Sequence, residues 1–209
     1  MADRAPTRSA ALALAEERTV IRQGYDFLDE KRMLLAGEMV SKVARHRELE
    51  ADWQHRAADA AEALGGAVAA LGLDGLQSWP PLLRDTARIE RTETAFLGVF
   101  LVAAKLDAAH LDPEALPLAF APLAASPAAE TARAAFAGLI GLAAEMAAVA
   151  ASLHRLMEDY RRTERRARAL ENVLLPDIEA ELKRIGEHLE MVDQEEAVRV
   201  RKAAARQAR

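Results

Sequence analysis

The chain has 209 residues and a formal net charge of −5, and its residues are 51% hydrophobic, 29% charged and only 4% aromatic. A chain of this length can bury a real core, but the scarcity of aromatic residues argues against a β-sandwich or an α/β core. The acidic balance argues against a general nucleic-acid-binding protein, and the absence of cysteine excludes disulfides and thiolate metal sites.

After a short N-terminal tail, 1–7, the sequence predicts a helix over 8–70. Ala, Leu, Glu, Arg and Lys dominate this stretch, which holds no proline, and Pro6 and Thr7 precede it as a helix entry signal. Its apolar residues recur every seven positions, at Leu14, Ile21, Leu28 and Leu35. That spacing is typical of a coiled-coil seam, and a helix of this length spans on the order of 90 Å. Such a helix is too long to bury itself in a compact domain.

The middle of the chain, 71–131, holds most of the prolines and several glycines, and it predicts a small head. Its stretch from about 86 to 105 is rich in β-branched and aromatic residues, namely Ile89, Thr92, Thr94, Phe96, Val99, Phe100 and Val102. This composition favours a short β-hairpin. The alternative is a short buried helix from Thr94 to Leu106.

Helix is predicted again over 132–205. Ten seam positions ending at Leu174 step alternately by four and three, as in a coiled coil. The next steps, through Ile178 to Leu182, are four and four, a stutter that locally unwinds a left-handed supercoil. Pro176 lies inside the stutter and removes one helical hydrogen bond, so we expect an irregularity of the helix there.

Two helices of this length with a head between them must fold back on each other. We therefore predict a mainly all-α fold, a long antiparallel two-helix coiled coil with a small head. A register in which paired residue numbers sum to about 210 places Gly24 opposite Gly186. We expect the helices to pack through Ile21, Gly24, Leu28, Leu35, Leu170, Pro176, Leu182, Gly186 and Leu189.

Two groups of basic residues are candidates for partner binding. The first is an outward-facing group of five arginines, Arg161, Arg162, Arg165, Arg166 and Arg168. A solvated face with ion pairs from Glu158 to Arg162 and from Glu164 to Arg168 is the structural alternative. The arginines without such a pair favour an acidic protein partner over nucleic acid, because no aromatic residue accompanies them. The second group lies at the C-terminus and includes Arg199, Arg201 and Lys202, ahead of a basic tail, 206–209.

The sequence predicts no catalytic, cofactor or metal site. The histidines, His46, His55, His110, His154 and His188, show no metal-ligand spacing, and motifs for phosphate loops or activated nucleophiles are absent. Residues 1–7 lack the apolar core of a signal peptide, and Glu145 interrupts the longest apolar run. We therefore expect a soluble, cytoplasmic protein.

Both ends of the chain resemble the D subunit of the V-type (archaeal and vacuolar-type) ATPases and ATP synthases. The first end carries the family's Pro-Thr-Arg and its later Gly, Leu and Lys-Arg, at Pro6, Thr7, Arg8, Gly24, Leu28, Lys31 and Arg32. The second carries Arg161, Arg162, Thr163, Arg165, Arg166, Ala169, Leu170, Glu171 and Pro176. Arg168 stands where the family has asparagine, and Leu175 precedes the proline in place of the usual isoleucine.

The resemblance implies a non-catalytic rotor shaft that transmits torque between a nucleotide-hydrolysing hexamer and a membrane ion-translocating ring. It implies that both termini enter the hexamer of A and B subunits, and that the head contacts the F subunit and the socket subunit. The residues expected at the hexamer are Pro6, Thr7, Arg8, Arg161, Arg162, Arg165, Arg166, Arg199, Arg201 and Lys202. The protein would then lie in the cytoplasm, peripheral to the inner membrane, without inserting into it. The alternative function is that of a free-standing coiled-coil scaffold or adaptor.

Overall fold

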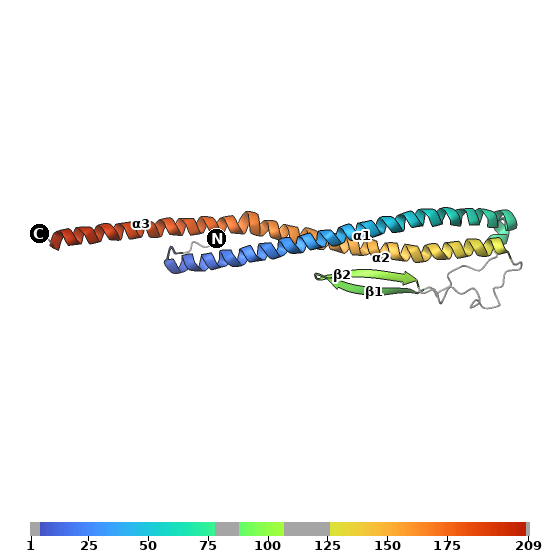
Figure 1. The fold of residues 1–209 in the computed structure, drawn as a ribbon, viewed down its shortest axis with the longest axis horizontal. Helices are drawn as coiled ribbons and strands as arrows, with labels where there is room; N and C mark the ends of the chain where they lie inside the picture. Colours follow the sequence, from blue (N-terminus) through green and yellow to red (C-terminus); the bar gives the residue numbers. More distant parts are fainter. Residues whose placement is uncertain (1–4, 78–87, 107–125, 208–209) are drawn as a thin grey trace. The chain divides into compact units, whose positions relative to one another are not determined.

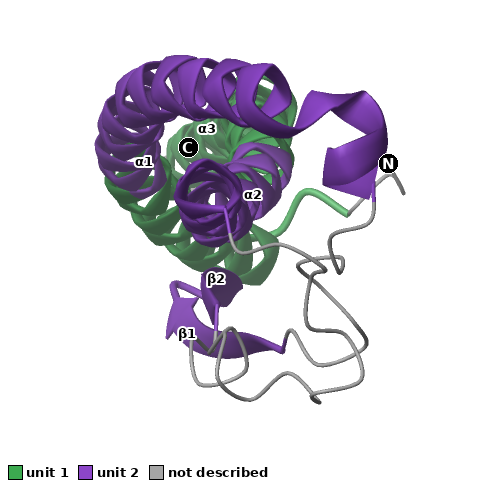
Figure 2. Ribbon diagram, turned by 90° about the vertical axis from the view of Figure 1, so that its right-hand side faces the viewer, with its two compact units in different colours: residues 1–34, 160–209 green, residues 35–159 purple. Residues whose placement is uncertain are grey.

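The computed structural model describes residues 5–77, 88–106 and 126–207 (Figure 1). The elements in chain order are α1 (Arg8–Gln77), β1 (Ile89–Phe96), β2 (Val99–Leu106), α2 (Pro127–Ala169), the π-helical turn η4 (Leu170–Leu174) and α3 (Leu175–Gln207). The predicted fold class is confirmed: long helices pair, and the only sheet among the described residues is a two-stranded antiparallel hairpin. Figure 2 colours two compact units, the terminal unit (1–34 and 160–209) and the hairpin unit (35–159).

Local signals mark both ends of α1. The Thr7 hydroxyl accepts a hydrogen bond from the backbone N–H of Ala10 at 3.2 Å, so Thr7 caps the first turn. Near the other end, Gly72 has φ 70° and ψ 166°, a conformation that is open essentially to glycine alone. The helical geometry is therefore interrupted at Gly72, and a single short turn follows to Gln77.

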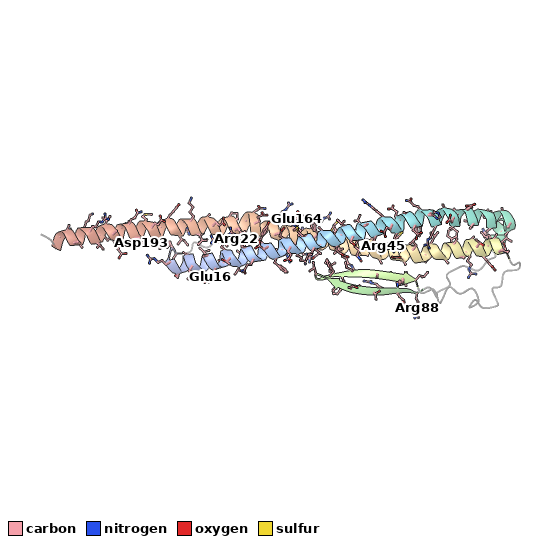
Figure 3. All side chains as sticks on the ribbon, viewed as in Figure 1. Glu16, Arg22, Arg45, Arg88, Glu164 and Asp193 are labelled. Carbon is pink, nitrogen blue, oxygen red and sulfur yellow. The ribbon has the colours of Figure 1, made fainter. Side chains whose placement is uncertain are left out.

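In the terminal unit, the start of α1 packs antiparallel against α3. Leu14, Ile178 and Ile185 are buried together, and Ala10, Ala11, Ile21, Leu182 and Leu189 pack around them. Ion pairs flank this core, from Arg8 to Asp193 at 3.0 Å and from Arg22 to Glu179 at 3.5 Å. Figure 3 labels Arg22 and Asp193 of these pairs. Of the predicted packing residues, Ile21, Leu182 and Leu189 thus contact this core, whereas Pro176 is exposed.

The predicted register is wrong. A Cβ built on Gly24 would lie 3.7 Å from Leu170 Cδ1, and one built on Gly186 would meet no atom within 4 Å. The prediction placed the first turn of α1 beside the last turn of α3. Because Arg8 meets Asp193, α3 instead continues for about fourteen residues beyond the first turn of α1. Gly186 therefore does not face Gly24.

A π-helical turn lies at the predicted irregularity. The backbone N–H of Leu175 donates to the carbonyl of Leu170, five residues back instead of four. Pro176 follows at once and supplies no N–H of its own, and its ring would crowd the carbonyl four residues earlier in a regular helix. The wider turn and the proline together explain why the heptad spacing breaks between Leu174 and Leu182.

In the hairpin unit, α1 and α2 run antiparallel with two kinds of contact. Leu49 packs against Leu142 and Val149 in one cluster. Farther along, Ala67 packs against Ala129 and Ala132, small side chains that let the two helices approach closely. A cross-helix ion pair joins Arg45 to Glu145 at 2.7 Å, and Glu145, followed by Glu48, raises the pKa of Arg45.

Within the described residues, one helical run passes the length and composition test for a membrane span. It is Pro127–Arg206, where an apolar window reaches a mean hydropathy of 1.8 with 28% of it buried. Core helices of soluble proteins pass the same test, and Leu142 and Val149 of this run are buried against α1. Much of the apolar character comes from alanine, which gains little from lipid.

Candidate functional site

The hairpin is closed by a tight turn. Leu97 and Gly98 both have positive φ, 50° and 87°, as a type I′ turn requires. Phe96 pairs with Val99 beside the turn, and the register continues to Ile89 opposite Leu106. In such a hairpin every second residue directs its backbone N–H and C=O away from the partner strand. On β2 these residues include Phe100 and Val102.

The outer backbone edge of β2 is held by α2. The Ser152 hydroxyl, on a residue that is 1% exposed, accepts from the N–H of Val102 at 2.7 Å and donates to its C=O at 3.1 Å. Arg155 donates to the carbonyl of Phe100 at 2.8 Å. Both views of the hairpin unit place β2 between α2 and β1 (Figures 1 and 2). We call Ser152 and Arg155 the hairpin seat.

A glycine lets the base of the hairpin approach α2. A Cβ built on Gly141 would lie 3.7 Å from Leu106 Cβ, an ordinary contact distance. A large side chain at this position would therefore push the base of β2 off the helix. The sequence analysis missed the seat, although Ser152 was a detectable signal because it is a hydroxyl within an alanine-rich apolar run.

The outward-facing arginines of α2 are exposed as expected. Glu164 pairs with Arg168 at 2.6 Å, as predicted. The other predicted pair does not form, because the Glu158 carboxylate lies 3.3 Å from His154 instead. Of these five outward-facing arginines, four have no ion-pair partner among the residues that the structure describes. They are Arg161, Arg162, Arg165 and Arg166, and we call them the arginine face.

The remaining predicted interface residues belong to the ends of the terminal unit. Pro6 and Thr7 are exposed, and Arg8 is already paired with Asp193. The basic residues near the C-terminus are exposed on α3, where Arg199 pairs weakly with Glu195 at 3.6 Å. They lie roughly 55 Å along the helix from the arginine face. The structure therefore separates the predicted interface into two basic patches.

An apolar ridge on α1 was missed. Val20 is 66% exposed, Phe27 66% and Leu34 49%. They recur every seven residues, each one position before a seam residue, so they share one side of the helix. The seven-residue spacing of these three residues was visible in the sequence. The adjacent seam residues repeat with the same spacing, so the apolar pattern was assigned to the seam alone. Exposed side chains of this size are typical of a surface that meets a partner.

The family-like positions Gly24 and Leu170 meet at the π-helical turn. Beside them, the Glu171 carboxylate raises the pKa of the Tyr25 hydroxyl, to which it is hydrogen-bonded, and partial burial and Asp29 act in the same direction. Glu171 is one residue into the π-helical turn, so this contact links the turn to α1.

The hairpin unit also has a groove of about 390 Å³ between its two helices. Four residues on each helix line it: Val43, His46, Arg47 and Glu50 of α1, and Ala150, Leu153, His154 and Met157 of α2. Residues 150, 154 and 157 lie on the opposite side of α2 from the hairpin seat. The groove and the hairpin thus occupy different faces of the same unit.

Among the described residues, no group of three or more His, Cys, Asp or Glu side chains could hold a metal ion. His46 is half-buried, while His55, His154 and His188 are exposed. His110 lies outside the described residues.

The family model for the D subunit of ATP synthase matches residues 10–205. The chain belongs to the family of ATP synthase D subunits. It is 23% identical to the V-type ATP synthase D subunit of Thermotoga neapolitana over 98% of both chains. It is 27% identical to a V-type ATP synthase D subunit of Treponema pallidum, the one numbered 2, over 83% of this chain and 81% of the relative. The A-type ATP synthase D subunit of Pyrococcus furiosus is 26% identical over 96% of this chain and 92% of the relative.

The surface features described above divide between the two units of the chain. The arginine face, the π-helical turn and Thr7 all lie in the terminal unit. The hairpin seat and the groove belong to the hairpin unit. The two units of this D subunit therefore carry chemically distinct surfaces.

Proposed function

We propose that this chain is the central-stalk rotor shaft of a V/A-type rotary ATPase or ATP synthase. It transmits torque between the hexamer that hydrolyses nucleotides and the membrane ring that carries ions, and it has no catalytic site or cofactor of its own. The observation that carries the proposal is the match to the family of D subunits over residues 10–205. The antiparallel helix pair of the terminal unit supports it, since two wound helices resist twisting better than one.

In this proposal, 8–70 and 132–205 form the shaft and 71–131 the head. The termini enter the hexamer of A and B subunits, with Pro6, Thr7, Arg8, Arg199, Arg201 and Lys202 among the contacts. The head, with its β-hairpin, faces the F subunit and the socket subunit. The chain is cytoplasmic and peripheral to the inner membrane, and it binds no nucleic acid.

The arginine face is the part of this proposal that we would test first. Its cations are exposed and lack partners within the described residues, so they are available to acidic residues of a surrounding protein. Exposed charges contribute little binding energy each and are screened by salt. Contacts of this kind suit a surface that must guide rotation without holding it.

Reversal of the arginine face should uncouple the assembled complex. The variant Arg161→Glu, Arg165→Glu and Arg166→Glu should lower ATP-driven ion transport about tenfold, because like charges then face each other across the interface. A matched control reverses three cations that lie outside the head and outside the proposed contact residues, Arg47, Arg133 and Lys183, for the same change in charge. Circular dichroism of each isolated variant should match that of the parent.

Two outcomes would count against the rotor. One is equal loss of transport in the control variant, which would indicate a general effect of charge. The other is an intact complex that assembles and couples ATP hydrolysis to ion transport after deletion of this chain. Recovery of the chain free of nucleotide-binding subunits would favour the alternative, a free-standing coiled-coil scaffold or adaptor.

A further inference from the structure

None of the residues that the structure describes pairs with the outer edge of β1. The β2 edge is occupied by the hairpin seat, while β1 is exposed along Ile89–Ala95. By the alternation of the hairpin, Arg91 and Glu93 direct their backbone groups outward. Among the residues that the structure describes, no hydrogen bond reaches those groups. Two-stranded sheets are only marginally stable, and an open edge is a template for another strand.

The side chains along this edge are complementary to themselves. Arg91 and Glu93 lie two residues apart on the same face of β1 and form an ion pair with each other. If two copies of β1 run antiparallel about a twofold axis at Thr92, Arg91 of each faces Glu93 of the other. The same symmetry places Thr92 opposite Thr92, a favourable pair in sheets, and Ile89 opposite Ala95.

We propose that, outside its complex, this chain binds a second copy of itself through β1. The two hairpins join into one four-stranded antiparallel sheet, and the hairpin seat of each copy keeps β1 directed away from α2. The contact covers an edge that would otherwise recruit unrelated strands. It is small, so the dimer is weak, with a Kd on the order of 100 µM.

The register of the proposed β1–β1 pairing can be measured directly. Because the chain contains no cysteine, a single introduced cysteine can form a disulfide only with its copy. In the proposed pairing, Thr92 and its copy form a non-hydrogen-bonded pair about 4.5 Å apart at Cα, within the range of a disulfide. Thr94 lies on the same face and is equally exposed, but its two copies are roughly 13 Å apart. Under mild oxidation, full-length Thr92→Cys should form a linked dimer at least about ten times faster than Thr94→Cys. Equal rates would overturn the register.

Charge exchange tests the same pairing without a thiol. Arg91→Glu places two acids opposite each other, and Glu93→Arg places two bases, so each single variant should weaken dimerisation in sedimentation equilibrium about tenfold. The double variant Arg91→Glu/Glu93→Arg restores opposite charges and should regain the affinity of the parent. A parent that stays monomeric at millimolar concentration, or a double variant as weak as the singles, would overturn the proposal. Neither result bears on the rotor, which is tested in the assembled complex.

Discussion

At the scale of single residues, two glycines of α1 have opposite structural roles. Gly24 is helical, and a Cβ there would make an ordinary contact with Leu170 at 3.7 Å. Gly72 has positive φ, and nothing lies within 4 Å of a Cβ built on it. The first glycine therefore has room for a side chain in a favourable backbone conformation. The second has room for a side chain in a backbone conformation that only glycine adopts readily.

Alanine should accordingly have opposite effects at these two positions. Gly24→Ala should stabilise the chain by about 0.5–1 kcal/mol, because alanine loses less backbone entropy than glycine in a helix. Gly72→Ala should destabilise it by about 1–3 kcal/mol, because the backbone conformation there is strained for any other residue. Thermal unfolding followed by circular dichroism measures both. The same sign of effect for the two variants would contradict this account.

At the scale of elements, the hairpin depends on polar contacts with α2. A single buried hydroxyl satisfies both the N–H and the C=O of Val102, as a neighbouring strand would. Arg155 adds a bond to Phe100 and lies 3.8 Å from Glu93. Directional bonds of this kind fix the position of a strand along a helix more closely than apolar contact alone.

Loss of the Ser152 hydroxyl should release the hairpin without unfolding the helices. Ser152→Ala leaves the backbone groups of Val102 without partners, which costs about 1–3 kcal/mol. Hydrogen exchange at the Val102 amide should accelerate about tenfold to a hundredfold, while the amides of α1 keep their protection. Ser41→Ala, an exposed serine on α1, is the matched control and should change neither. Unchanged exchange at Val102 would mean that the seat does not hold β2.

The elements were predictable to different degrees, for physical reasons. Residues such as Leu14, Leu35 and Ile178 were found because a helix repeats its buried side every three or four positions. The hairpin was found from the composition of its strands and confirmed over Ile89–Leu106. The register was not found, because a seam that repeats every seven residues fits several offsets almost equally. The hairpin seat depends on contacts distant in sequence, which no local pattern encodes.

At the scale of the whole molecule, the two units carry different surfaces. The terminal unit has the arginine face on α2 and an exposed apolar ridge on α1, so its sides differ in chemistry. The hairpin unit offers an open strand edge and a groove between helices. In the proposed rotor, the arginine face would guide rotation within the hexamer, and the head would hold the partners that rotate with it. This division of roles follows from the proposed function.

Pro176 is the residue with which the role of the helix irregularity in the proposed torque transmission can be tested. It is the second residue after the π-helical turn, where the helix already departs from regular hydrogen bonding. Pro176→Ala restores an N–H and removes the ring, so the isolated chain should become more stable by about 1–3 kcal/mol, measured by thermal unfolding. If the irregularity shapes the shaft, the turnover of the assembled complex should change as well.

The comparison of stability with turnover decides what the proline is for. Asn172→Ala, at an exposed position in the π-helical turn, keeps Pro176 and serves as the control, with little expected effect on either measurement. Higher stability with altered coupling in Pro176→Ala alone would make the irregularity part of torque transmission, since a straighter helix would press on each neighbouring interface differently. Higher stability with unchanged coupling would make the proline a tolerated flaw, because the π-helical turn already accommodates its missing hydrogen bond.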